Sequence, residues 1–144
     1  MVEADAIIDV PKMKTHDQTF VTLSLKNLKG IMPDTFKRKL HHVFGVFQGC
    51  ADLATVARPA LSVVDGVMAM EGLGPTMGDP VEMDLIIAGR DLVAVDAVTS
   101  AVMGFEPMED GCIRAAAESG VGTADLSKIE VVGEPIAKVQ RQFK

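Results

Sequence analysis

Short apolar runs alternate along this chain with segments that have helical spacing. Four of the runs predict buried strands, at residues 5–10, 60–70, 82–89 and 128–133. Three segments predict helices, at residues 48–57, 92–103 and 111–119. This alternation predicts an α/β fold, a mostly parallel sheet with helices on both faces in a three-layer sandwich. The 144 residues are expected to form a single α/β domain.

Local signals set the ends of several elements. Asp91 and Asp110 each precede an apolar periodic segment and are predicted to cap a helix, which Gly104 and Gly120 then end. Residues 18–29 fit both strand alternation and helical spacing. We favour a helix there, because Gly30 and Pro33 form a stop signal just after it.

The amino-acid composition is typical of a folded globular domain. The chain is 48% hydrophobic and 24% charged, as expected for a folded domain, and no apolar run reaches the ~18 residues of a membrane span. It enters a strand almost at once, so we expect an excerpt of a longer protein. Two isolated cysteines predict a reduced, cytoplasmic location and cannot alone ligate an iron–sulfur cluster.

Charge is spread unevenly over the chain. The net charge is -6, yet residues 1–42 hold seven of the 14 Lys and Arg and only five of the 20 Asp and Glu. A single basic segment in an acidic protein indicates a local anion site rather than a nucleic-acid surface. The chain has no Trp or Tyr, and its six Phe occupy apolar positions, so base stacking is not expected.

Polar residues follow three predicted strands. Lys12, Lys14 and His16 follow the first strand, and their spacing of two puts them on one side of an extended chain. Asp65 follows the second strand core, and Asp91 follows the third. If these strands are parallel, the groups converge at the carboxyl edge of the sheet, where α/β proteins bind ligands. The alternative interpretation is that the lysines at the end of the first strand are solvent-exposed and bind no ligand.

Further ligand-binding candidates lie in the predicted helix and in a glycine-rich loop. Lys26 and Lys29 share a helix face, and Asn27 lies beside it. Gly72 and Gly74 are expected to let a ligand approach the loop backbone, with Glu71 beside them. The alternative interpretations are a solvent-exposed helix face for the lysines and a wide turn for the glycine-rich loop.

The predicted catalytic residues are His16, Asp65 and Asp96. His16 is the expected general acid or base, because an imidazole titrates near neutral pH. Asp96 is the lone charge in an apolar helix, so it needs an ion-pair partner, free backbone amides or a ligand. The adjacent His41 and His42 form no HxxxH or HxH pattern, and we expect no metal site.

Four motifs in this order resemble a known family: DVPKMKTH, LSLKNLKGIMP, LSVVDGVMAMEGLGPTMGDP and DLIIAGRDLVAVDAVTSAVMG. The chain resembles, over roughly residues 4–133, the family called domain of unknown function 362. The resemblance implies a redox-associated role, since members are often fused to ferredoxin-like iron–sulfur segments.

Two functions are therefore expected. The first is an enzyme domain that binds a small anionic substrate or a nucleotide-like cofactor through Lys12, Lys14, Lys26 and Lys29. The second is a non-catalytic module that docks an iron–sulfur partner or a neighbouring domain through its basic segment. The reaction, the cofactor and the oligomeric state do not follow from the sequence.

Overall fold

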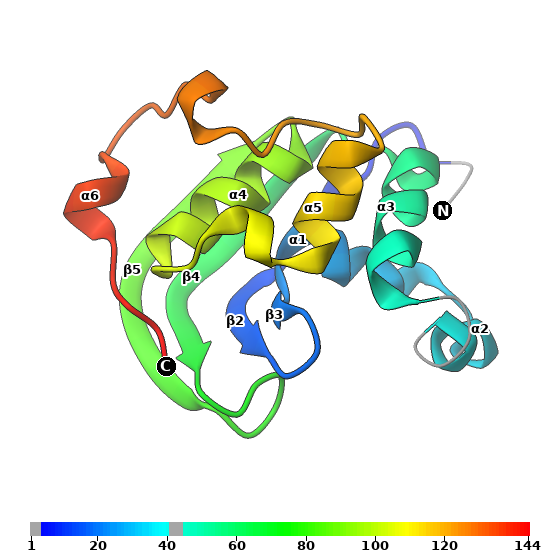
Figure 1. The fold of residues 1–144 in the computed structure, drawn as a ribbon, viewed down its shortest axis with the longest axis horizontal. Coiled ribbons are helices and arrows are strands. Elements are labelled where there is room, and N and C mark those ends of the chain that lie inside the picture. Colours follow the sequence, from blue (N-terminus) through cyan, green and yellow to red (C-terminus); the bar gives the residue numbers. More distant parts are fainter. Residues whose placement is uncertain (1–3, 41–44) are drawn as a thin grey trace.

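The computed structural model describes residues 4–40 and 45–144, in which one sheet lies against a group of helices (Figure 1). The strands are β1 (Ile8–Asp9), β2 (Lys12–His16), β3 (Phe20–Val21), β4 (Leu61–Glu71) and β5 (Asp79–Gly89). The α-helices are α1 (Leu23–Asn27), α2 (Asp34–Lys39), α3 (Val46–Ala57), α4 (Leu92–Val102), α5 (Gly111–Glu118) and α6 (Ile136–Val139). Short 3-10 helices are η1 (Leu28–Ile31), η3 (Pro107–Glu109) and η4 (Leu126–Lys128).

The long strand β4 organises the sheet. β1 and β2 pair with it in parallel, one after the other, and are separated at Pro11, which has no amide hydrogen to donate. β3 pairs antiparallel with β2, and β5 pairs antiparallel along the opposite edge of β4. The α/β class and the parallel pairing of the first strands with β4 are confirmed.

The direction of β5 differs from the prediction. Only residues 72–78 connect β4 to β5, which is too short for the crossover that a parallel pair requires. The two strands therefore form a hairpin, and Asp91 after β5 lies at the opposite end of the sheet from the carboxyl end of β4. The expected convergence of three strand ends is wrong for this strand.

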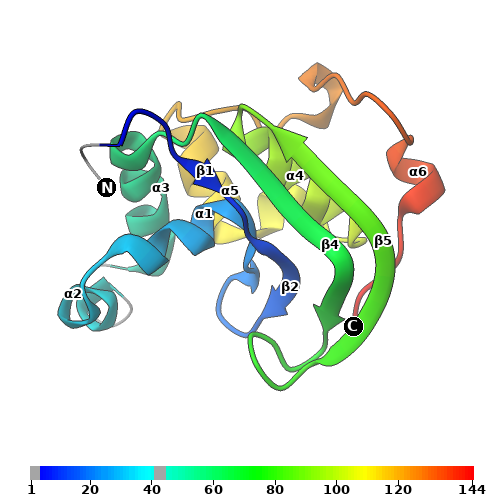
Figure 2. The ribbon, with the colours of Figure 1, turned by 180° about the vertical axis from the view of Figure 1, so that it is seen from behind.

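The helices form two layers over one face of the sheet. α1 and α4 contact the strands, whereas α3 and α5 pack on each other and on α1 and α4. Seen from behind, the sheet lies in front of these helices, and no helix of the described residues covers that face (Figure 2). Val67, Met68 and Ile86 are exposed there or at its edge.

The predicted helix ends are confirmed by hydrogen bonds. The Asp91 carboxylate accepts from the amides of Val93 and Ala94, and Asp110 caps α5 in the same way. Gly104 has a φ of 84°, as a glycine stop requires. Residues 18–29 contain both predicted structures, because β3 precedes α1.

The strand predicted at residues 128–133 is wrong. Lys128 ends η4, residues 129–133 pair with no described strand, and Val132 is 88% exposed. Its apolar alternation lacks a neighbouring strand with which to form hydrogen bonds. The tail beyond it docks instead, since α6 packs against α4 and Phe143 is buried.

Candidate functional site

A basic hollow lies at the carboxyl end of β2, where the chain turns towards α1. It has a volume of about 360 Å³ and is lined by Lys14, His16, Thr22, Lys26, Asn27, Lys29, Gly30, Lys37 and Pro75. Four of these residues are lysines, and none of the described lining residues is acidic. The hollow can therefore attract an anion.

His16 and Lys26 form the inner part of the basic hollow. His16 Nε2 lies 3.0 Å from Lys26 Nζ, and the Lys26 residue is only 8% exposed. On the other side of the imidazole, Nδ1 lies 2.9 Å from the Asp17 carboxylate and accepts from the Gln18 amide at 3.1 Å. The Gln18 amide and the Lys26 side chain thus contact the two ring nitrogens, and these contacts fix the orientation of the ring.

The lysines of the hollow influence one another. The pKa of Lys26 lies below its ordinary value of 10.5, mainly because burial disfavours its charged form, and Lys14 lowers it further. The pKa of Lys29 is lowered by burial and by the neighbouring charges of Lys26 and Lys37. An anion bound between them would oppose this repulsion.

Asn27 and Thr22 contribute polar groups. The Asn27 amide donates to Asp9 Oδ1 at 2.7 Å, and burial raises the pKa of that carboxyl group. The Thr22 hydroxyl oxygen is buried and has no hydrogen-bond partner within residues 4–40 and 45–144. A buried hydroxyl without a partner is costly, and Thr22 is one of the residues that line the hollow.

The glycine-rich loop packs against β2. Thr15 Oγ1 donates to the Gly72 carbonyl at 3.0 Å, and a Cβ at Gly74 would collide with the Thr15 backbone. This close approach places Pro75 at the hollow, where its carbonyl accepts from Lys14 Nζ at 3.1 Å. Gly72 and Gly74 therefore position the wall without lining the hollow themselves.

Asp65 and Lys12 lie apart from the basic hollow. They are partners in the β2–β4 register, and Lys12 Nζ donates to Asp65 Oδ2 at 2.8 Å. Asp65 lies in the middle of β4 rather than at a strand end, because β4 continues to Glu71. Neither residue lines the hollow that holds His16.

Asp96 holds the start of α1. The carboxylate is 1% exposed and accepts from the Ser24 amide and the Leu25 amide, each at 2.8 Å. The sequence analysis left three kinds of partner open for Asp96, and the structure shows backbone amides. Asp96 does not line the hollow, but it holds the helix that carries Lys26 and Asn27.

Glu71 binds the end of the described chain. Its Oε2 accepts from the Lys144 amide at 3.1 Å, and Oε1 lies 3.9 Å from Lys144 Nζ. The Gly72 amide donates to the Lys144 carbonyl at 3.0 Å. Glu71 is therefore occupied by the polypeptide itself.

The structure thus brings together five of the predicted residues: Lys14, His16, Lys26, Asn27 and Lys29. It adds Thr22, Gly30, Lys37 and Pro75, which were not among the predicted site residues. Lys37 belongs to the basic run Lys37-Arg38-Lys39, whose charge is evident from the sequence although its place in the fold is not. His41 and His42 lie outside the described residues.

Comparisons with known proteins give one family and one similar curated protein. The model of a family described as Domain of unknown function (DUF362) matches residues 1–101. The chain is similar to the thylakoid-associated protein sll1697 of Synechocystis sp., with 36% identity over 111 residues. That match covers 74% of this chain and 35% of the relative, so the chain spans about a third of its length.

Two further findings concern solved structures and membrane-spanning helices. No solved structure matches the chain significantly. No helix among the described residues is both long and apolar enough to cross a membrane.

The family match spans more than half of the chain and includes every residue that lines the basic hollow. The chain therefore belongs to the DUF362 family.

Proposed function

We propose that the basic hollow binds a small anion, either an anionic substrate or the phosphate part of a nucleotide-like cofactor. One observation carries the proposal: four lysines and a histidine line a single hollow of about 360 Å³, and no described lining residue is acidic. Lysines bind phosphate and carboxylate groups by charge-assisted hydrogen bonds.

Each residue has a distinct role in this proposal. Lys26 and Lys29 neutralise the charge of the ligand, because both line the hollow and no described acidic residue lines it with them. Thr22 supplies a hydroxyl that lacks another partner within the described chain. His16 is the candidate general acid or base, since its Nε2 already exchanges a hydrogen bond with Lys26.

Isothermal titration calorimetry with phosphate, pyrophosphate and AMP tests the proposal. We expect Lys26→Met and Lys29→Met to weaken binding of the tightest of these by about tenfold each, which corresponds to ~1.4 kcal/mol. Lys128→Met is the charge-matched control, since Lys128 is exposed and pairs with Asp125 far from the hollow. No binding at millimolar anion, or equal affinity for all three variants, would contradict the proposal.

The second candidate is docking of an acidic iron–sulfur partner or a neighbouring domain on the same lysines. The match to only 35% of the relative supports it, because most of that longer protein lies outside the aligned part. Docking predicts salt-sensitive binding of an acidic ferredoxin, without measurable affinity for phosphate or AMP. A redox-associated role and a cytoplasmic location stay predictions.

A further inference from the structure

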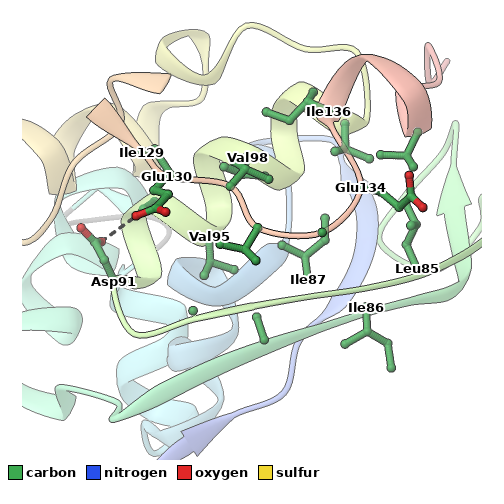
Figure 3. A pocket seen from close by; sticks show the side chains of 18 of the residues that line it. Leu85, Ile86, Ile87, Asp91, Val95, Val98, Ile129, Glu130, Glu134 and Ile136 are labelled. Atoms are coloured by element: carbon green, nitrogen blue, oxygen red, sulfur yellow. Dashed lines mark hydrogen bonds between the residues drawn. The ribbon is translucent and has the colours of Figure 1, made fainter. Parts of the chain in front are cut away.

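A second cavity lies on the other side of the molecule, away from the basic hollow. It has a volume of about 430 Å³ and lies between residues Leu85–Gly89 of β5, Val95 and Val98 of α4, and the segment that contains Ile129 and Ile136 (Figure 3). The side chains that face it are mainly aliphatic. We call it the edge cavity.

The edge cavity exposes main-chain groups as well as apolar side chains. All five residues from Leu85 to Gly89 line it, although the Ile86 side chain points away from it (Figure 3). Ile86 therefore lines the cavity through its backbone. β5 pairs only with β4 within the described part of the chain, so its other edge carries N–H and C=O groups that no described strand satisfies.

The occupant must suit both features. A purely apolar small molecule would leave the edge amides and carbonyls of β5 unsatisfied in a largely apolar space, which is costly. An extended peptide forms main-chain hydrogen bonds with such an edge and inserts alternate side chains into pockets. We propose that the edge cavity accepts a β-strand of about five residues that pairs with Leu85–Gly89.

The chemistry of the walls defines this strand further. Every second side chain would face Val95 and Val98 of α4, so these positions should be aliphatic. Asp91, Glu130 and Glu134 also line the cavity, with Arg90 as the one described base, so Lys or Arg should flank the strand.

We propose that this strand comes from a segment of longer DUF362 proteins that has no counterpart in these 144 residues. The relative sll1697 supports this source, because the match covers only 35% of it and leaves most of its polypeptide to supply such a segment. The inference uses different residues from the anion proposal, so each can fail alone.

Short overlapping peptides from the unmatched parts of sll1697 provide the probe. Each is titrated into the 144-residue protein, with fluorescence polarisation as the readout. We expect a peptide with alternate aliphatic residues and basic flanks to bind and to slow amide hydrogen exchange at the cavity edge of β5 by at least tenfold. Absence of any binding peptide, or protection that excludes β5, would overturn the proposal.

Two controls separate strand pairing from simple apolar contact. Two versions of the bound peptide are methylated at alternate backbone nitrogens, and at least one should bind at least tenfold more weakly. Equal binding by both would overturn the strand. In the protein, Val98→Thr should weaken binding, whereas Val56→Thr, at a position 78% exposed on α3, should not.

Discussion

The Nε2 atom of His16 lies 3.0 Å from the Nζ atom of Lys26, across the space between β2 and α1. An imidazolium and an ammonium offer only donors to each other, so this contact requires that one of the two nitrogens has lost a proton. One of the two nitrogens therefore donates this hydrogen bond and the other accepts it. Burial lowers the pKa of Lys26, because it disfavours the charged form of the side chain.

Anion affinity should fall in alkaline solution before ordinary lysines titrate. The pKa values of Lys26 and Lys29 both lie below 10.5, so the hollow loses positive charge as pH rises towards that value. Sulfate is the suitable probe, because its own charge is constant over this range. Calorimetry between pH 7 and pH 10 should show declining affinity, with a smaller decline for Lys26→Met. A flat profile would refute the role of the lysines.

Replacement of Asp96 should destabilise the fold. An Asn side chain retains a single acceptor oxygen, so one of the amides of Ser24 and Leu25 would face a donor in a buried site. We expect Asp96→Asn to lower the free energy of unfolding by about 1–3 kcal/mol. Urea denaturation measures this, with the exposed Asp79→Asn as the matched control. Equal midpoints would show that the carboxylate does not hold α1.

Stability should decrease as pH rises from about 4 to 7. Burial raises the pKa of Asp96 to about 7 and that of Asp110 to about 6, from 3.8. The folded state therefore binds more protons than the unfolded state in this window, and the stability present below pH 3.8 is lost as pH reaches the folded values. Urea midpoints at several pH values test the slope. Constant midpoints, or midpoints that rise with pH, would contradict these assignments.

The pair of Lys12 and Asp65 should matter little to either stability or anion binding. Both side chains are about two-fifths exposed, and exposed ion pairs contribute about 0–1 kcal/mol. Asp65→Asn should therefore leave phosphate affinity within twofold of the parent protein. A larger loss of phosphate affinity would contradict this prediction and would mean that the Asp65 carboxylate can take part in the anion site.

The sequence predicted well what local chemistry determines. The caps at Asp91 and Asp110 need only neighbouring amides, and the alternation of Lys14 and His16 needs only an extended chain. The direction of β5 was missed because a hairpin and a crossover share the same apolar runs. The partners of Asp96 and the contribution of Thr22 depend on segments far apart in the chain, and no spacing rule reveals those contacts.

The attachment of α1 to Asp96 has a consequence for engineering. The backbone that carries Lys26 and Asn27 is held from the protein interior, because the Asp96 carboxylate accepts from the main-chain amides of Ser24 and Leu25. Exchange of a lining lysine therefore leaves this attachment in place. This separation makes the domain a scaffold on which selectivity for different anions could be varied by library selection.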